Sequence, residues 1–182
     1  MPSNDADLAP LFHIVLHQPE IPNNTGNIGR TCMATGCSLH LIRPLGFSTG
    51  EKACRRAGLD YWPRLAPTEH EGFEEYLEAA RPWVGGMWLF TTKCSRPVWD
   101  AKLGLGDQLV FGRETAGLPE SILERYPDRL VTLPMVPGER SLNLATAVCA
   151  VVYEGIRQLA AAGVVAMDGD GRIVRAESAE GR

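Results

Sequence analysis

The sequence lacks the features that mark membrane, secreted and metal-binding proteins. No run of apolar residues is long enough to span a bilayer, and the polar segment 1–7 is unlike a secretory signal. None of the five cysteines forms a pair with the two-residue spacing of a zinc or redox motif. We therefore expect a cytoplasmic protein with reduced thiols and no metal site.

The surplus of positive charge that nucleic-acid-binding proteins usually carry is also absent. The formal net charge is −4 at pH 7, which argues mildly against such a protein but allows a local basic patch. The sequence has no Gly-x-Gly-x-x-Gly fingerprint after a strand, no Walker loop and no Gly-x-Ser-x-Gly elbow. These absences count against nicotinamide- or flavin-dependent enzymes of the usual kind.

The patterns that are present predict a single α/β domain. Short apolar runs typical of buried strands occur at 11–16, 38–43, 86–91, 108–111 and 130–133. Helical patterns lie between or after them, at 24–35, 68–80, 119–125 and 142–162. This alternation predicts a Rossmann-like parallel sheet flanked by helices. We expect residues 1–10 to form a flexible arm, 11–163 the domain and 164–182 a mobile tail.

Three loops that carry polar residues follow predicted strands and are candidates for a ligand site. The segment Asn24–Arg30 opens a helix, and Arg30 either clamps an anionic substrate or is a solvated surface residue. The segment Gly112–Pro119 places Glu114 two residues past a strand and is either functional or a plain turn. In Leu133–Asn143 two prolines restrict the backbone, and Ser141 is either functional or the cap of the last helix.

Taken together, the three loops resemble in order and spacing the motifs of the SPOUT class of RNA 2′-O-ribose methyltransferases. The resemblance covers 12–160. Within the class, Pro19–Asn27 and Arg55–Tyr61 look most like the small branch that methylates the wobble nucleotide, position 34 (cytidine or uridine), of tRNA. The resemblance implies a C-terminal trefoil knot, against the usual rule of unknotted chains. It also implies S-adenosyl-L-methionine bound in the knot, and a homodimer with its active site at the subunit interface.

The resemblance also implies roles for individual residues. The cofactor pocket would be lined by Phe90, Gly112, Leu133, Met135, Ser141 and Leu142. The catalytic and substrate positions would be Asn24, Arg30, Glu114, Ser141 and Asn143. The ribose 2′-oxygen would attack the methyl carbon of the sulfonium in line, without a metal, and we expect Arg30 to fix the adjacent phosphate and stabilise the developing alkoxide.

The anticodon loop of tRNA would meet a local basic patch, despite the acidic net charge. The cations expected to face RNA are Arg30, Lys52, Arg55, Arg56, Arg64 and Arg140. Tyr61 or Trp62 would either stack on an anticodon base or belong to the core. Two alternatives stay open: a 2′-O-methyltransferase acting on another tRNA position or on rRNA, and a non-catalytic RNA-binding module.

Overall fold

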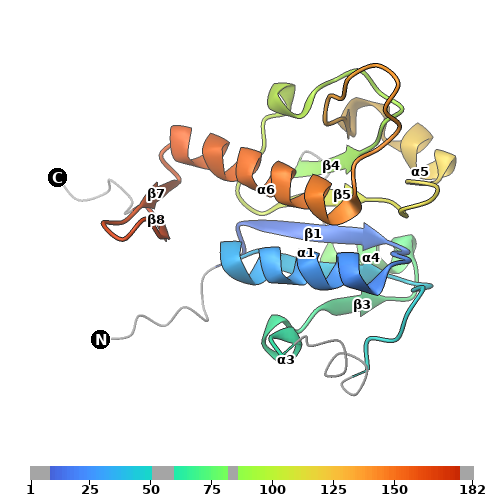
Figure 1. The fold of residues 1–182 in the computed structure, drawn as a ribbon, viewed down its shortest axis with the longest axis horizontal. Coiled ribbons are helices and arrows are strands. Elements are labelled where there is room, and N and C mark those ends of the chain that lie inside the picture. Colours follow the sequence, from blue (N-terminus) through green and yellow to red (C-terminus); the bar gives the residue numbers. More distant parts are fainter. Residues whose placement is uncertain (1–8, 51–59, 82–85, 177–182) are drawn as a thin grey trace.

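A computed structural model describes residues 9–50, 60–81 and 86–176 of the chain. Its centre is a six-stranded sheet in which every pairing is parallel and the strand order is β3-β2-β1-β5-β4-β6 (Figure 1). The strands are β1 (Phe12–His17), β2 (Ser38–Ile42), β3 (Thr68–His70), β4 (Met87–Phe90), β5 (Asp107–Phe111) and β6 (Leu130–Val131). The predicted parallel α/β sheet is confirmed.

Helices cover both faces of this sheet. They are α1 (Pro22–Thr35), α3 (Trp62–Leu65), α4 (Phe73–Ala80), α5 (Glu120–Arg125) and α6 (Leu144–Ala161), with 3-10 turns η3 (Val98–Asp100) and η4 (Pro127–Arg129). Helices α1 and α6 lie side by side on one face (Figure 1). The side chains of α4 and α5 pack into the core on the other face.

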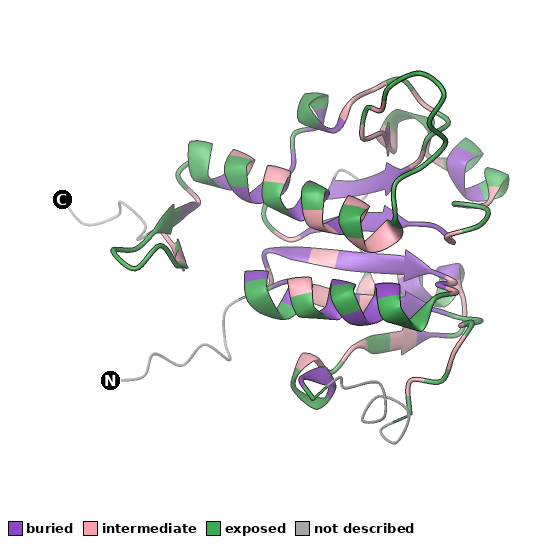
Figure 2. Cartoon of the chain, in the orientation of Figure 1, coloured by how far each residue is buried: buried purple, intermediate pink, exposed green. Residues whose placement is uncertain are grey.

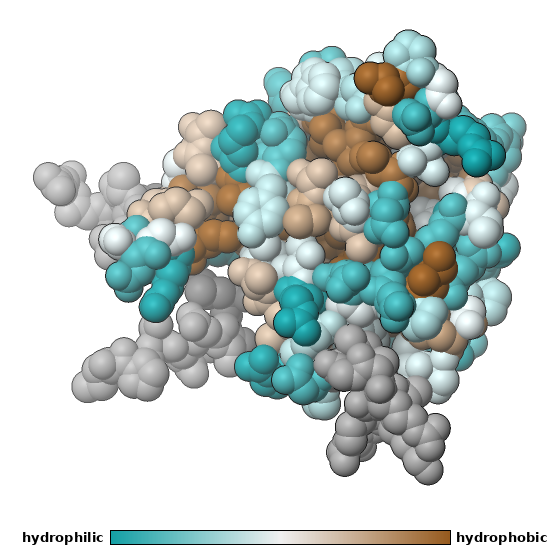
Figure 3. All heavy atoms as spheres, viewed as in Figure 1, coloured by the Kyte–Doolittle hydropathy of each residue, from teal (hydrophilic) through white to brown (hydrophobic). Residues whose placement is uncertain are grey.

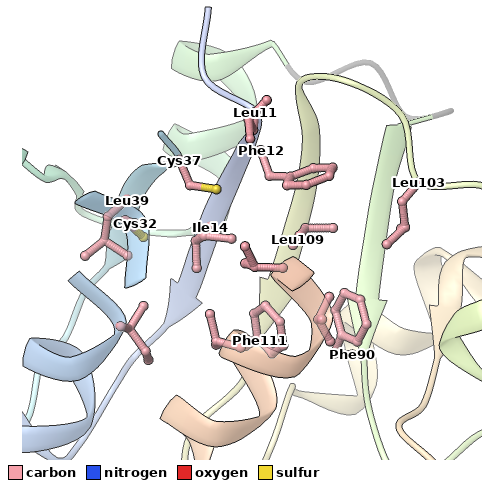
Figure 4. Close-up of a cluster of buried hydrophobic side chains, with 14 of the residues drawn as sticks. Leu11, Phe12, Ile14, Cys32, Cys37, Leu39, Phe90, Leu103, Leu109 and Phe111 are labelled. Carbon is pink, nitrogen blue, oxygen red and sulfur yellow. The ribbon is translucent and has the colours of Figure 1, made fainter. Parts of the chain in front are cut away.

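The central strands are buried on both faces (Figure 2), which explains their continuous apolar sequences. Phe12, Ile14 and Leu16 of β1 enter the core under α1 and α6, whereas Val15 enters the core under α4 and α5. Figure 4 shows Phe12 and Ile14 beside side chains from the neighbouring strands. Each fully buried side chain of this size contributes about 1.5–3 kcal/mol of stability.

Helix α6 approaches the sheet closely at Gly155. A Cβ added there would lie 2.5 Å from the Phe12 ring, so only glycine lets the helix sit at this distance. Among the described helices, α6 alone is long and apolar enough to cross a membrane by length and composition, so the expectation of no such segment was wrong on that criterion. Its apolar side is instead core: Val148, Val151, Val152, Ile156 and Leu159 pack in the cluster under α1 and α6.

The chain that leaves β6 lies between β4 and part of the connection from β4 to β5. On one side Val131 pairs with Phe90 of β4. On the other side Thr132 pairs with Pro97 of the connection, through hydrogen bonds of 2.9 Å to Arg96 O and 2.8 Å from Val98 N. The chain therefore passes between β4 and the connection before it forms α6. The trefoil knot stays a prediction, which requires that this chain pass through the earlier loop.

Two segments differ from the prediction. Residues Thr68–His70 form strand β3, not the first turn of a helix, because they pair with β2 at the edge of the sheet. The predicted tail is folded as far as it is described: β7 (Val165–Met167) and β8 (Ile173–Arg175) form an antiparallel hairpin. Its turn is closed by Asp168, whose carboxylate accepts from the N–H groups of Asp170 and Arg172.

Candidate active site

A cavity of about 660 Å³ opens at the carboxyl ends of β1, β5 and β4. In the sheet, β2 and β3 lie on one side of β1, and β5, β4 and β6 lie on the other. The direction in which successive strands are added to the sheet therefore reverses at the β1–β5 pair. Ligands of open α/β sheets bind at such a reversal. Figure 3 shows apolar side chains gathered between α6 and the loop that precedes it, ringed by polar ones.

All six residues predicted to hold a cofactor line this cavity: Phe90, Gly112, Leu133, Met135, Ser141 and Leu142. Phe90 ends β4, and its ring stacks on that of Phe111 at the end of β5, with centroids 4.6 Å apart. Arg140, predicted to face RNA, also lines the cavity. The apolar wall comes from the ends of strands and from the loop before α6.

The segment from Gly112 to Leu118 is a tight loop that forms one wall. Arg113 and Gly117 exchange two backbone hydrogen bonds, of 3.1 and 3.0 Å, and Gly117 has a φ of 69°. A Cβ on Gly112 would lie 2.0 Å from the carbonyl carbon of Gly117 and 2.1 Å from Leu118 N. Gly112 is therefore required by close backbone contact within the loop itself.

Three of the predicted catalytic residues form one chain of hydrogen bonds. Glu114 Oε1 accepts from Asn24 Nδ2 at 3.0 Å, and Asn24 Oδ1 accepts from Asn143 Nδ2 at 2.9 Å. The Glu114 carboxylate also accepts from the N–H groups of Glu20 and Ile21, at 2.8 and 3.3 Å. It thus lies at the N-terminus of α1, where the helix dipole favours negative charge. Residues from three separate motifs are joined at one place.

The cap of α6 is Asn143, not Ser141. Asn143 Oδ1 accepts from Ala145 N at 2.9 Å and from Thr146 N at 3.2 Å, so the structural alternative for Ser141 was wrong. Asn143 is the residue that can reach both groups, because it directly precedes the first turn. Ser141 lines the cavity and is exposed there. Its side chain is left available to a ligand.

Arg30 does not line the cavity with the other four predicted catalytic residues. It lies on the exposed side of α1, and its guanidinium packs over the Tyr61 ring, 5.1 Å from the centroid. Tyr61 and Trp62 are buried, and the Tyr61 hydroxyl donates to Gly26 O. Burial raises the pKa of Tyr61. The proposed stacking of Tyr61 or Trp62 on an RNA base is therefore wrong in this structure, and both belong to the core.

The remaining predicted RNA-binding cations divide into two groups. Arg64 is exposed on α3, away from the cavity. Lys52, Arg55 and Arg56 lie outside the described residues. Within the described part of the chain, no group of three or more His, Cys, Asp or Glu is arranged to hold a metal ion.

Several residues of the site were not predicted from the sequence. Thr91, Thr92 and Lys93, which directly follow β4, line the cavity, as do Arg113 and Thr115. Their position immediately after two buried strands was a usable signal, since such positions open onto the ligand crevice. Glu20 was missed as well, and nothing in its local sequence pointed to its contacts.

The parallel sheet, the cavity and the contacts between the motif loops fit the predicted SPOUT class of methyltransferases, and comparison with known proteins shows the family. The chain belongs to the SpoU rRNA Methylase family, whose sequence model matches residues 11–153. It is 46% identical over 154 residues to the tRNA (cytidine(34)-2'-O)-methyltransferase of Saccharophagus degradans, which covers 84% of this chain and 99% of that protein.

Two solved structures are similar to most of this chain. One comes from a study of the 2-OH methylation of C/U34 on tRNA. Its TM-score is 0.75 at 44% identity, and the match covers 82% of this chain and 97% of that one. The other is the SpoU methyltransferase AviRb from Streptomyces viridochromogenes in complex with the cofactor AdoMet. Its TM-score is 0.69 at 25% identity, and the match covers 85% of this chain and 63% of that one.

Proposed function

We propose that this chain is an S-adenosyl-L-methionine-dependent methyltransferase that modifies the ribose 2′-oxygen of the wobble nucleotide, position 34, of tRNA. One observation carries the proposal: a single cavity brings Asn24, Glu114, Ser141 and Asn143 together beside all six predicted cofactor residues. The choice of substrate rests on the high identity, over nearly the full length, to the relative that acts on cytidine 34 of tRNA.

The cavity suits S-adenosyl-L-methionine in size and lining. Its volume of about 660 Å³ lies within the range of small-molecule pockets. Phe90, Leu133, Met135 and Leu142 offer apolar surface for an adenine and ribose, and the backbone of Gly112, which also lines the cavity, offers hydrogen bonds. When bound, the cofactor supplies the methyl group. The residues of this chain hold and orient the reactants.

The polar groups of the site position the substrate and stabilise charge. Asn24 is buried, and its amide is fixed by Glu114 and Asn143, so it presents one geometry toward the cavity. An arginine side chain stays protonated in proteins and is a poor base. The role proposed for Arg30 is therefore to bind the phosphate next to the target ribose and to stabilise the alkoxide that develops at its 2′-oxygen. The planar, forked guanidinium suits both contacts.

The protein works as a homodimer in which Arg30 of one subunit completes the cavity of the other. The support is that one chain's cavity contains four of the five predicted catalytic residues and lacks Arg30, which faces outward on α1. The outward side of the α1–α6 pair also carries Met33 and Tyr153, the latter 54% exposed. Small neighbours such as Ala34 and Ala150 allow a second copy to approach closely.

A subunit-mixing experiment tests the shared site. Arg30→Ala chains and Gly112→Ala chains are each expected to be inactive alone. In a mixed dimer, the intact cavity of the Arg30→Ala chain receives Arg30 from the other subunit. Random mixing should restore about a quarter of the wild-type activity, since half of the dimers are mixed and each has one complete site. Mixed dimers, verified by size-exclusion chromatography with tagged subunits, that show no activity would contradict the arrangement.

The tRNA is expected to dock beside the cavity, where Arg140 of one subunit and the outward Arg30 of the other would meet. Phosphate contacts release counterions, so the affinity should fall as the salt concentration rises. A salt titration of tRNA binding without a slope would rule out a cationic docking surface. The enzyme then belongs in the cytoplasm, where its tRNA substrate is found.

The RNA class is tested by methyl transfer from labelled cofactor to purified tRNA and to purified rRNA. The proposal expects label in tRNA only. Label in rRNA would favour the main alternative, a methyltransferase with a ribosomal target. A chain that binds tRNA but shows no binding of S-adenosyl-L-methionine in calorimetry would instead be a non-catalytic RNA-binding module.

A further inference from the structure

The loop before α1 and the loop after β5 are joined by reciprocal hydrogen bonds, in which a carboxylate of each loop accepts from donors of the other. Glu114 accepts from the N–H of Glu20 at 2.8 Å. In return, Glu20 accepts from Thr115 N at 3.0 Å and from Thr115 Oγ1 at 2.8 Å. We call these five hydrogen-bonding groups, from Glu20, Glu114 and Thr115, the carboxylate clamp. Each loop therefore supplies one carboxylate and the donors for the other.

The Glu20 side of the clamp is fixed in place. The preceding loop is tied to β2 by Gln18 N, which donates to Ile42 O at 2.9 Å, and to the loop after β2 by Gly46 N, which donates to Pro19 O at 2.9 Å. A Cβ on Gly46 would lie 2.6 Å from Glu20 O, so the backbone here is already packed against its neighbour. The Glu20 carboxylate is thus a stationary acceptor.

The Thr115 side of the clamp belongs to the cavity. Thr115 lines it, within the tight loop that begins at Gly112, and Thr115 itself is exposed. Among the described residues, neither Glu20 nor Glu114 makes an ion pair with a cation, so both carboxylates depend on N–H and O–H donors. Hydrogen bonds to a carboxylate are about twice as strong as neutral ones.

We propose that Glu20 is a positioning residue, which holds the cofactor wall 112–118 against the start of α1 and so aligns the wall with Asn24. Glu20 does not line the cavity and acts only through Thr115 and Glu114. The inference rests on the proposed function, because its effect on turnover requires that the cavity be the methyl-transfer site. Misplacement of a site wall by about 1 Å can reduce turnover by up to a hundredfold.

The test compares Glu20→Ala, Glu20→Gln and Thr115→Val in the full-length protein. Glu20→Ala removes every acceptor for Thr115 and should weaken S-adenosyl-L-methionine binding and lower kcat by about tenfold each. Glu20→Gln keeps one acceptor and should recover most of this loss. Glu74→Ala, which removes an exposed glutamate that pairs with Arg125 on the far face, is the matched control and should behave as wild type.

Two further readouts separate positioning from a general loss of stability. The amide of Thr115 should exchange with deuterium faster in Glu20→Ala, while the melting temperature changes little. Adding Thr115→Val to Glu20→Ala should cost nothing more, because the partner is already gone. Wild-type cofactor affinity and kcat in Glu20→Ala, or fully additive effects in the double variant, would overturn the proposal. A wild-type chain that binds no cofactor would refute the proposed function instead, before any variant is compared.

Discussion

A row of three histidines across β1, β2 and β3 should make the fold sensitive to mild acid. His13 Nδ1 lies 3.1 Å from His40 Nε2, and His40 Nδ1 lies 3.1 Å from His70 Nε2. Ser38 Oγ contacts His13 Nδ1 at 2.8 Å, and the Tyr76 ring packs edge-on against His40 and His70. A neutral imidazole both donates and accepts, whereas a protonated one only donates. Full protonation would therefore break the row.

The size of the loss of stability in acid follows from the lowered pKa of His40. Burial, reinforced by the charges of His13 and His70, lowers the pKa of His40 to about 4, from 6.5 when exposed. Between these values the unfolded chain binds a proton at His40 that the folded chain does not. Stability is therefore complete above pH 6.5 and falls by about 1.4 kcal/mol per pH unit below it. By pH 5 the loss is about 2 kcal/mol from His40 alone, and burial lowers the pKa of His13 and His70 too.

Urea unfolding at pH 7.5 and pH 5.0, for wild type and two variants, measures this effect. His40→Gln retains a group near Nε2 and His40→Asn a group near Nδ1, and neither titrates. The wild type should lose about 2 kcal/mol more than either variant between the two pH values. An equal loss in all three proteins would show that the row does not control acid stability.

Three further predictions concern the cavity. Gly112→Ala should abolish S-adenosyl-L-methionine binding in calorimetry, since its Cβ would lie 2.0 Å from Gly117 backbone, whereas Gly72→Ala, with nothing within 4 Å, should bind normally. Asn143→Ala should cost about 1 kcal/mol in thermal unfolding and lower kcat, while Asn143→Ser should recover the cap but not the contact with Asn24. Arg30→Lys keeps the charge and loses the fork, so its kcat should fall with cofactor affinity unchanged; a full methylation rate would refute the role given to Arg30.

The strands could be predicted because a strand buried on both faces has a continuous run of apolar residues in its own sequence. Phe12 to Leu16 and Leu109 to Phe111 are almost wholly apolar, and they form most of β1 and most of β5. The order and register of the strands could not be predicted in this way, since they depend on pairing between segments far apart in the sequence. Thr68–His70 is a strand only because β2 offers it an edge. The hairpin after α6 was missed although its Asp-Gly-Asp-Gly turn is a hairpin signal.

The site shows the same division. The wall of the cavity could be predicted from the motif loops, because Gly112, Leu133 and Ser141 follow recognisable strands in the sequence. The contacts that join the loops could not, because Glu114 accepts from backbone N–H groups of a segment more than 90 residues away. Any residue has such an N–H group, so the sequence at Glu20 carries no mark of it.

The central claim is tested most directly by locating the methyl group. Total RNA incubated with the protein and labelled S-adenosyl-L-methionine is digested, and mass spectrometry identifies the modified nucleotide, with a synthetic tRNA carrying 2′-deoxyribose at position 34 as the control. The proposed function predicts a 2′-O-methyl group on cytidine or uridine 34 of tRNA and no transfer to the deoxy control. Methylation at another nucleotide, or equal labelling of the deoxy control, would contradict it.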